Sequence, residues 1–252
     1  MKHTLIYPIG ITQSCRYASE NLKHMGFSII DHPAPEVSHL LLDIPSFRSD
    51  GYLRSGDDLS KQLSMLPQNI TVAGGNLDLP VLSQFSKLDF LKDSDYLARN
   101  AAITADCAIK TAAPLTKSTF ADTPALILGW GRIGKCLAQL LKSLNCPVTV
   151  AARKDSDRAL LGALGYEALS FDALPDHLPR FRLLFNTVPS PVLSEEQLAC
   201  CQNCVKIELS SRNGLDGEDV IIARGLPGQL APESSGRLIA DTFYRLWKEG
   251  SR

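Results

Sequence analysis

The sequence predicts an α/β protein with a doubly wound parallel-sheet domain and a smaller N-terminal α/β domain, joined by a long bridging helix. The first third of the chain alternates short apolar runs with helical patterns, as small parallel α/β domains do. Residues 93–113 form an alanine-rich stretch without glycine or proline, which favours one long helix. Beyond it, the apolar residues 125–128 lead into a glycine turn and a second helical pattern.

In the first domain we expect strands over residues 4–9, 27–30, 40–42 and 70–73. Ser14 can cap a helix that ends at Gly26, and the acidic pair Asp57 and Asp58 suits the first turn of another helix. We expect this domain, which would hold substrate or a partner, over residues 1–92. The bridging helix and a linker then occupy residues 93–122.

The glycine turn at residues 129–134 reads Gly-Trp-Gly-Arg-Ile-Gly and is typical of a dinucleotide-binding (Rossmann) domain. In such a turn one glycine permits the tight bend, one lets the backbone approach a pyrophosphate, and one lets helix and strand pack closely. A tight turn without a ligand is the alternative, but the strand before it, the helix after it and a strand at 148–151 supply the context that the motif requires. The turn residues that we assign to cofactor binding are Gly129, Trp130, Gly131, Arg132, Ile133 and Gly134.

Further strands are expected over residues 166–169, 181–185, 205–209 and 220–223, which completes the six strands of a dinucleotide domain over residues 123–233. Ser194 and Gln197 have the spacing of a capping box at the start of a helix. Residues 234–252 read as a final helix that packs back onto the bridge or the first domain.

The end of the strand at 148–151 predicts NADP as the cofactor. An NAD site places an Asp or Glu about 20 residues after the first glycine, where it bonds the ribose 2′-hydroxyl. Here Ala152 is followed by Arg153 and Lys154, and cations suit a 2′-phosphate. The alternative is that both are solvated surface charges, and equal affinity for NADP and NAD would favour it. We assign Ala152, Arg153 and Lys154 to the cofactor.

The next two strands end in polar segments that should line the same cleft, because ligands bind at the carboxyl ends of strands in open parallel sheets. Asn186, Thr187, Val188 and Pro189 follow one strand and are assigned to the nicotinamide side, with a simple turn as the alternative. Ser210, which follows the next strand, is also assigned to the cofactor.

Ser211 and Arg212 come directly after Ser210, and we assign both to catalysis. The Arg212 guanidinium matches the two oxygens of a substrate carboxylate, although an ordinary surface arginine is the alternative. None of the histidines lies where a hydroxy-acid dehydrogenase needs its proton-transfer group, which argues against that mechanism.

The composition excludes several classes of partner. A net charge of -1 argues against nucleic acid or an anionic membrane held by bulk electrostatics. The first apolar run is too short for a signal peptide, and we expect a cytoplasmic protein. Its 7 cysteines are expected to be reduced thiols. The cluster of Cys200, Cys201 and Cys204 lacks a fourth ligand, so packing is favoured over zinc and no metal is predicted.

Taken together, these stretches resemble the A subunit of dipicolinate synthase, which makes pyridine-2,6-dicarboxylate during bacterial sporulation. The resemblance is strongest from Leu88 onward and rests on residues 100–109, the glycine turn, residues 186–189, and the Gly-Leu-Pro-Gly-Gln-Leu-Ala-Pro segment at 225–232, followed by Ser235. It implies oxidation of a dihydrodipicolinate-type ring by hydride transfer to NADP, and it implies a partner, a flavoprotein-like B subunit. Self-association is left open.

The resemblance also implies a substrate site for a small dicarboxylate. Thr104 and Asp106 would face the cleft, with Asp106 as a catalytic group, although the family more often has Glu-Gly where this chain has Asp106 and Cys107. The residues that we assign to substrate are Gly75, Thr104, Arg212 and Ser235.

The first eighty residues depart from the family, which usually has a longer N-terminal domain with a Gly-Gly-Asp-x-Arg-like turn. Arg16 is either what remains of that turn or an ordinary helix residue. Two other functions therefore remain open. One is an NADP-dependent reductase of another small carboxylic acid, and the other is a non-catalytic NADP-binding subunit.

Overall fold

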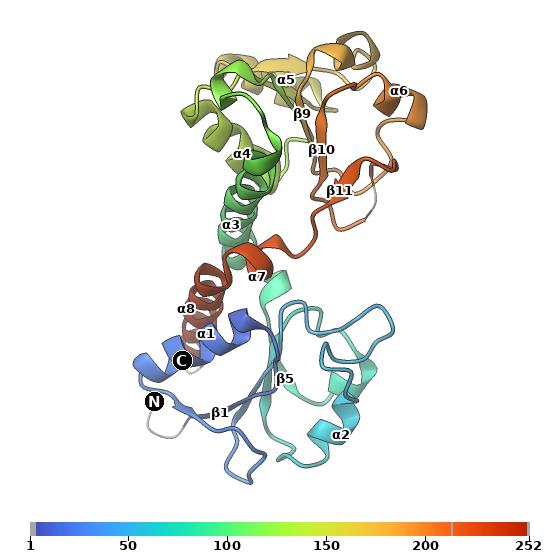
Figure 1. The fold of residues 1–252 in the computed structure, drawn as a ribbon. Coiled ribbons are helices and arrows are strands. Elements are labelled where there is room, and N and C mark those ends of the chain that lie inside the picture. Colours follow the sequence, from blue (N-terminus) through green and yellow to red (C-terminus); the bar gives the residue numbers. More distant parts are fainter. Residues whose placement is uncertain (1–3, 213, 251–252) are drawn as a thin grey trace. The chain divides into compact units, whose positions relative to one another are not determined.

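The computed structural model describes residues 4–212 and 214–250 and divides the chain into two compact units (Figure 1). The first unit comprises residues 1–100 and 227–252, and the second comprises residues 101–226. Among the described residues, every helix is too short or too polar to serve as a transmembrane span.

The first unit is built on a five-stranded sheet in the order β2-β1-β3-β4-β5. All neighbouring strands are parallel. The strands are β1 (Leu5–Pro8), β2 (Ser28–Ile29), β3 (His39–Leu41), β4 (Thr71–Gly74) and β5 (Ser86–Asp89). Because the chain reverses direction of winding between β1 and β3, the order is that of a doubly wound sheet.

Two helices of the first unit begin at side-chain caps. Thr12 caps α1 (Gln13–His24), because its hydroxyl oxygen accepts the backbone N–H of Cys15. The prediction that Ser14 is the cap was wrong: Ser14 lies inside the helix and is buried. Asp58 caps α2 (Leu59–Leu63) by accepting the N–H of Ser60.

The C-terminal helix α8 (Pro232–Gly250) packs along α1 in the first unit (Figure 1). The two helices come so close at Gly236 that a Cβ there would lie 2.4 Å from the Cβ of Tyr17. Farther along, Phe243 packs edge-on against Phe27, with ring centroids 5.5 Å apart. A short helix, α7 (Leu226–Leu230), precedes α8.

The second unit contains a six-stranded sheet in the order β11-β10-β9-β6-β7-β8. Its strands are β6 (Ala125–Leu128), β7 (Val148–Ala151), β8 (Glu167–Leu169), β9 (Leu183–Asn186), β10 (Val205–Glu208) and β11 (Val220–Ile222). All neighbours are parallel, and the order reverses between β6 and β9. This is the strand order of a dinucleotide-binding domain, so the predicted fold class is confirmed.

Three α-helices connect these strands: α4 (Arg132–Ser143), α5 (Asp155–Ala163) and α6 (Glu195–Ala199). The capping box predicted at α6 is present, because Ser194 and Gln197 exchange side-chain to backbone hydrogen bonds. The long helix α3 (Ser94–Ala112) begins in the first unit and ends in the second. It stops just before Pro114, which lies in a short 3₁₀ turn (Ala113–Leu115).

Candidate dinucleotide-binding site

In the turn between β6 and α4, backbone conformation and packing explain why two of the positions are glycine. Gly129 has a φ of 102°, and a Cβ there would lie 2.6 Å from the Thr187 hydroxyl oxygen. At Gly134 a Cβ would lie 2.3 Å from the carbonyl oxygen of Gly129. The first glycine thus permits the bend and the third lets the helix start pack on the strand end, as in dinucleotide-binding turns.

Neither backbone conformation nor packing within the described chain requires a glycine at position 131. It is the N-cap of α4 with a φ of -81°, and no described atom lies within 4 Å of where its Cβ would be. The helix therefore begins without a side-chain cap for its first N–H groups. A glycine that packing does not require, at an uncapped helix start, fits the close approach of a pyrophosphate.

The neighbouring turn residues are partly open as well. Arg132 is exposed, whereas Ile133 is half-buried. The indole of Trp130 lies 6.0 Å from the ring of Tyr166, and its buried Nε1 has no hydrogen-bond acceptor among the described residues. Buried indole N–H groups usually find an acceptor, so the unpaired Trp130 Nε1 is an exception in this turn.

After β7, Ala152 is buried, and Arg153 and Lys154 are exposed. A residue that the sequence did not single out, Arg158 on α5, holds this segment: its Nη1 donates to the carbonyl oxygens of Ala152 and Arg153, each at 2.8 Å. Sequence offers little signal for this role, because Arg158 sits among ordinary helix residues.

A cavity of about 510 Å³ opens beside this segment and is called the β7–α5 cavity below. Its lining includes Arg153, Asp155, Arg158, Ser170, Asp172 and Ser190. It therefore joins the segment after β7 to the residues that follow Pro189, at the carboxyl edge of the sheet where ligands of such folds bind.

Hydrogen bonds from its own side chains hold the segment that follows β9. The Asn186 amide nitrogen donates to the carbonyl oxygen of Val188 at 2.9 Å, and the amide oxygen accepts the N–H of Val188 at 3.0 Å. The Thr187 hydroxyl donates to the carbonyl oxygen of Leu128 at 2.8 Å. Both side chains thus shape the turn, while Pro189 is exposed at its end.

Glu208, at the end of β10, is a site residue that the sequence does not predict. It is fully buried, and its Oε2 accepts hydrogen bonds from the Asn186 amide and from the backbone N–H groups of Gly214 and Leu215, at 2.8, 3.0 and 2.8 Å. Its Oε1 accepts the N–H of Ser210 at 2.8 Å. The sequence signal for this role is a glutamate at the end of an apolar strand, because a buried carboxylate needs hydrogen-bond donors around it.

Of the predicted residues after β10, Ser210 is buried and its hydroxyl donates to the carbonyl oxygen of Arg212. Ser211 and Arg212 are exposed. Among the described residues, the Arg212 guanidinium has no ion-pair or hydrogen-bond partner, so it is available to an anion.

The predicted substrate residues fall in both units. Gly75 and Ser235 belong to the first unit, and Thr104 and Arg212 to the second. Both residues of the first unit are buried, and at Gly75 packing alone accounts for the glycine, because a Cβ would lie 2.8 Å from Leu91.

Thr104 and Asp106 do not share a face of α3. Thr104 is buried, whereas Asp106 is exposed and forms an ion pair of 2.8 Å with Lys110, one helical turn away. Residues two apart on a helix point to different sides, which is why the structure does not bring these two together.

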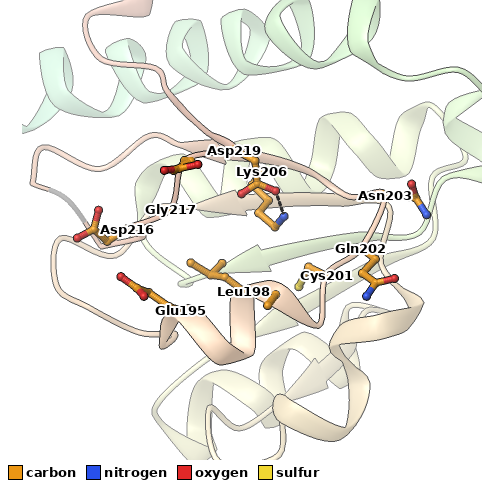
Figure 2. Close-up of a pocket in the computed structure, with 11 residues that line it drawn as sticks. Glu195, Leu198, Cys201, Gln202, Asn203, Lys206, Asp216, Gly217 and Asp219 are labelled. Carbon is orange, nitrogen blue, oxygen red and sulfur yellow. Dashed lines mark hydrogen bonds and ion pairs between the residues drawn. The ribbon is translucent and has the colours of Figure 1, made fainter.

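A second cavity, of about 670 Å³, lies at the amino ends of β10 and β11 (Figure 2). Cys201 lines it, and its thiol donates to the carbonyl oxygen of Gln197. The buried Lys206 amine forms an ion pair with Asp219 (Figure 2). Among residues 4–212 and 214–250, no three His, Cys, Asp or Glu side chains are arranged to hold a metal ion.

Comparison with known proteins agrees with the resemblance predicted from the sequence. The chain is 27% identical to the A subunit of dipicolinate synthase from Bacillus subtilis over 258 aligned positions, which cover 89% of this chain and 87% of the relative. The crystal structure of the corresponding A subunit from Bacillus halodurans matches it with a TM-score of 0.81 and 20% identity, covering 97% of this chain and 98% of that one. The chain resembles the dipicolinate synthase A subunits in sequence and in fold.

The fold that this chain shares with the dipicolinate synthase A subunits is also found in dehydrogenases. L-Alanine dehydrogenase matches with a TM-score of 0.65 at 9% identity, covering 98% of this chain and 90% of that one. No protein-family model matches the chain. The chain therefore shares its fold with L-alanine dehydrogenase, and the predicted resemblance to the A subunits of dipicolinate synthase is confirmed.

Proposed function

We propose that this chain is the A subunit of a dipicolinate synthase, an NADP-dependent oxidoreductase that oxidises a dihydrodipicolinate-type ring to dipicolinate. The observation that carries the proposal is the β6–α4 turn, in which Gly129 and Gly134 are required by packing and Gly131 is left free for a ligand. It occurs in a chain similar to a dipicolinate synthase A subunit over 89% of its length.

The cofactor would lie along the carboxyl edge of the second unit's sheet. The turn at residues 129–134 would hold the pyrophosphate on the N–H groups that begin α4. Exposed Arg153 and Lys154 would pair with the 2′-phosphate, since no Asp or Glu stands directly at the end of β7. The bound nicotinamide supplies the hydride acceptor.

The other site residues would act on the substrate. Arg212, whose guanidinium has no partner in the described part of the chain, would bind one carboxylate of the ring, and Ser211 would lie beside it. The substrate roles of Gly75, Thr104 and Ser235 and the catalytic role of Asp106 stay predictions from the family resemblance, since the structure does not bring Thr104 and Asp106 together. Because aromatisation favours the oxidation, the ring needs to lose only a hydride and a proton, without a strong base.

Co-expression with a candidate B subunit tests the proposal. The purified proteins are mixed with NADP⁺ and freshly generated dihydrodipicolinate, and NADPH absorbance and dipicolinate are followed together. Equal amounts of both products support the proposal. No dipicolinate from protein with measured NADP binding would contradict it and favour a non-catalytic subunit, and turnover of another carboxylic acid alone would favour a different reductase.

A further inference from the structure

One guanidinium fixes the segment that follows β7. Arg158 donates from Nη1 to the carbonyl oxygens of Ala152 and Arg153, each at 2.8 Å, and from Nη2 to the carboxylate of Asp155. The Arg158 side chain is only 25% exposed, whereas that of Asp155 is 93% exposed. Arg158 thus lies beneath the segment and binds it at three points.

These hydrogen bonds of Arg158 lie at the end of β7, where the ribose of a bound dinucleotide would be recognised. Arg153 follows one of the bonded carbonyls directly, and both arginines line the β7–α5 cavity. Two hydrogen bonds from one largely buried guanidinium restrain the backbone of residues 152 and 153. The Arg153 side chain is therefore attached to a backbone of fixed conformation.

The charges in this cavity are balanced. The lining contains two arginines, Arg153 and Arg158, and two carboxylates, Asp155 and Asp172, of which Asp155 pairs with Arg158. Without Arg158, the solvent-exposed Asp155 carboxylate at the rim of the cavity would lose its paired cation and would oppose a 2′-phosphate, which carries about two negative charges near pH 7. A nearby free carboxylate is also the group that NAD sites use to bond the 2′-hydroxyl.

We infer that Arg158 is a specificity-determining residue, which selects the 2′-phosphate by fixing the Arg153 backbone and by neutralising Asp155. The inference rests on the proposed NADP site and adds to it a residue that acts mainly through its neighbours. A purely structural role in α5 would instead weaken the binding of every nucleotide alike.

The test compares 2′,5′-ADP with AMP, and NADP⁺ with NAD⁺, by titration calorimetry on the full chain. The wild type is expected to prefer the 2′-phosphorylated member of each pair. Arg158→Gln should weaken NADP⁺ and 2′,5′-ADP about 10-fold, the loss of roughly one charge-assisted contact between Arg153 and the 2′-phosphate, and should change NAD⁺ and AMP less than about threefold.

The second substitution separates charge from backbone. Adding Asp155→Asn to Arg158→Gln should recover part of the lost NADP⁺ affinity, because it removes the uncompensated carboxylate. Arg158→Lys, which keeps the charge but not the forked donor, should lie between wild type and Arg158→Gln. Arg237→Gln is the matched control, since Arg237 also pairs with a helical carboxylate, Glu233, but lies in the first unit.

The outcomes distinguish this inference from the function on which it rests. A wild type that binds NADP⁺ and NAD⁺ equally overturns the proposed cofactor and this inference with it. A wild type that prefers NADP⁺, together with an Arg158→Gln variant that loses both nucleotides equally or keeps the wild-type ratio, overturns this inference alone.

Discussion

The side-chain amide of Asn186 donates a hydrogen bond to the buried carboxylate of Glu208, with Nδ2 2.8 Å from Oε2. This bond links the end of β9 to the end of the neighbouring strand β10. The same carboxylate oxygen accepts the N–H groups of Gly214 and Leu215. One buried acid therefore positions both the turn after β9 and the loop that carries Arg212.

Substituting Glu208 by Gln should destabilise the second unit. A glutamine amide presents an NH₂ group to at least one of the N–H donors that now bind the carboxylate, and a buried donor left without an acceptor costs about 1–3 kcal/mol. Chemical denaturation measures the loss in the free energy of unfolding, and NADP⁺ titration should show weaker binding because the adjoining turn is no longer fixed.

The exposed Glu218 provides a matched control, because the same substitution there removes no buried bond. Glu218→Gln should change the free energy of unfolding by less than about 0.5 kcal/mol. Equal effects at the two positions would show that the Glu208 network does not contribute to stability.

The glycine turn predicts that fold and cofactor binding can be separated. Gly131→Ala should cost less than about 1 kcal/mol of stability, because its Cβ meets no atom of the described chain, yet should weaken NADP⁺ binding at least about tenfold by blocking the backbone. Gly134→Ala should destabilise the protein by about 1–3 kcal/mol, because its Cβ would lie 2.3 Å from a carbonyl oxygen.

Gly162→Ala on α5 controls for adding a methyl group in open space, since no described atom lies within 4 Å of its Cβ either. It should stabilise the helix by about 0.5–1 kcal/mol and leave NADP⁺ binding unchanged. Wild-type NADP⁺ affinity in Gly131→Ala would place the pyrophosphate elsewhere.

Much of the fold follows from the sequence because its signals are local. The strand of residues 125–128, the glycine turn and the helix after it are adjacent in the chain, and so are the Ser194 and Gln197 of the capping box. By contrast β5 was not predicted: its sequence, Ser-Lys-Leu-Asp, is polar and half-exposed at a sheet edge, without the alternation of a strand.

Interactions between residues distant in the sequence explain why the cap of α1 and the role of Glu208 were not predicted. Asp43 accepts the N–H of Thr12 and the Thr12 hydroxyl, which favours Thr12 over Ser14 as the cap, and the two residues are 31 positions apart. Glu208 binds an amide 22 positions away. Such pairings depend on the sheet order, which periodicity does not reveal.

The open guanidinium of Arg212 leads to a prediction about substrate alone. Arg212→Met should raise the KM for the dicarboxylate at least about tenfold, the loss of roughly 1.4 kcal/mol of charge-assisted binding, with NADP⁺ affinity and stability unchanged. Steady-state kinetics in the presence of the B subunit measures KM. Arg224 is not a suitable control because it has interactions of its own, whereas the exposed Arg237 in the first unit offers a comparison. An unchanged KM would remove Arg212 from the substrate site.

His39, at the start of β3, should make the stability of the protein depend on pH. Burial lowers the pKa of its imidazole to about 4, and its ring packs against Phe243 with centroids 5.3 Å apart. In the unfolded chain the pKa is the ordinary 6.5, so the unfolded state binds more protons between these two values. Stability is therefore complete above pH 6.5 and falls as the pH drops toward 4, by about 1.4 kcal/mol per pH unit and roughly 3 kcal/mol in all.

Urea denaturation at pH 7 and pH 5 measures this dependence in a range where most carboxylates stay ionised. The wild type should lose about 2 kcal/mol over this interval, and His39→Gln should lose much less, since its side chain does not titrate. His24→Gln, at an exposed position on α1, should keep the wild-type slope. If His39→Gln and the wild type lose the same stability between the two pH values, the acid sensitivity arises from other groups, and the half-buried His39 imidazole does not link folding of the first unit to protonation.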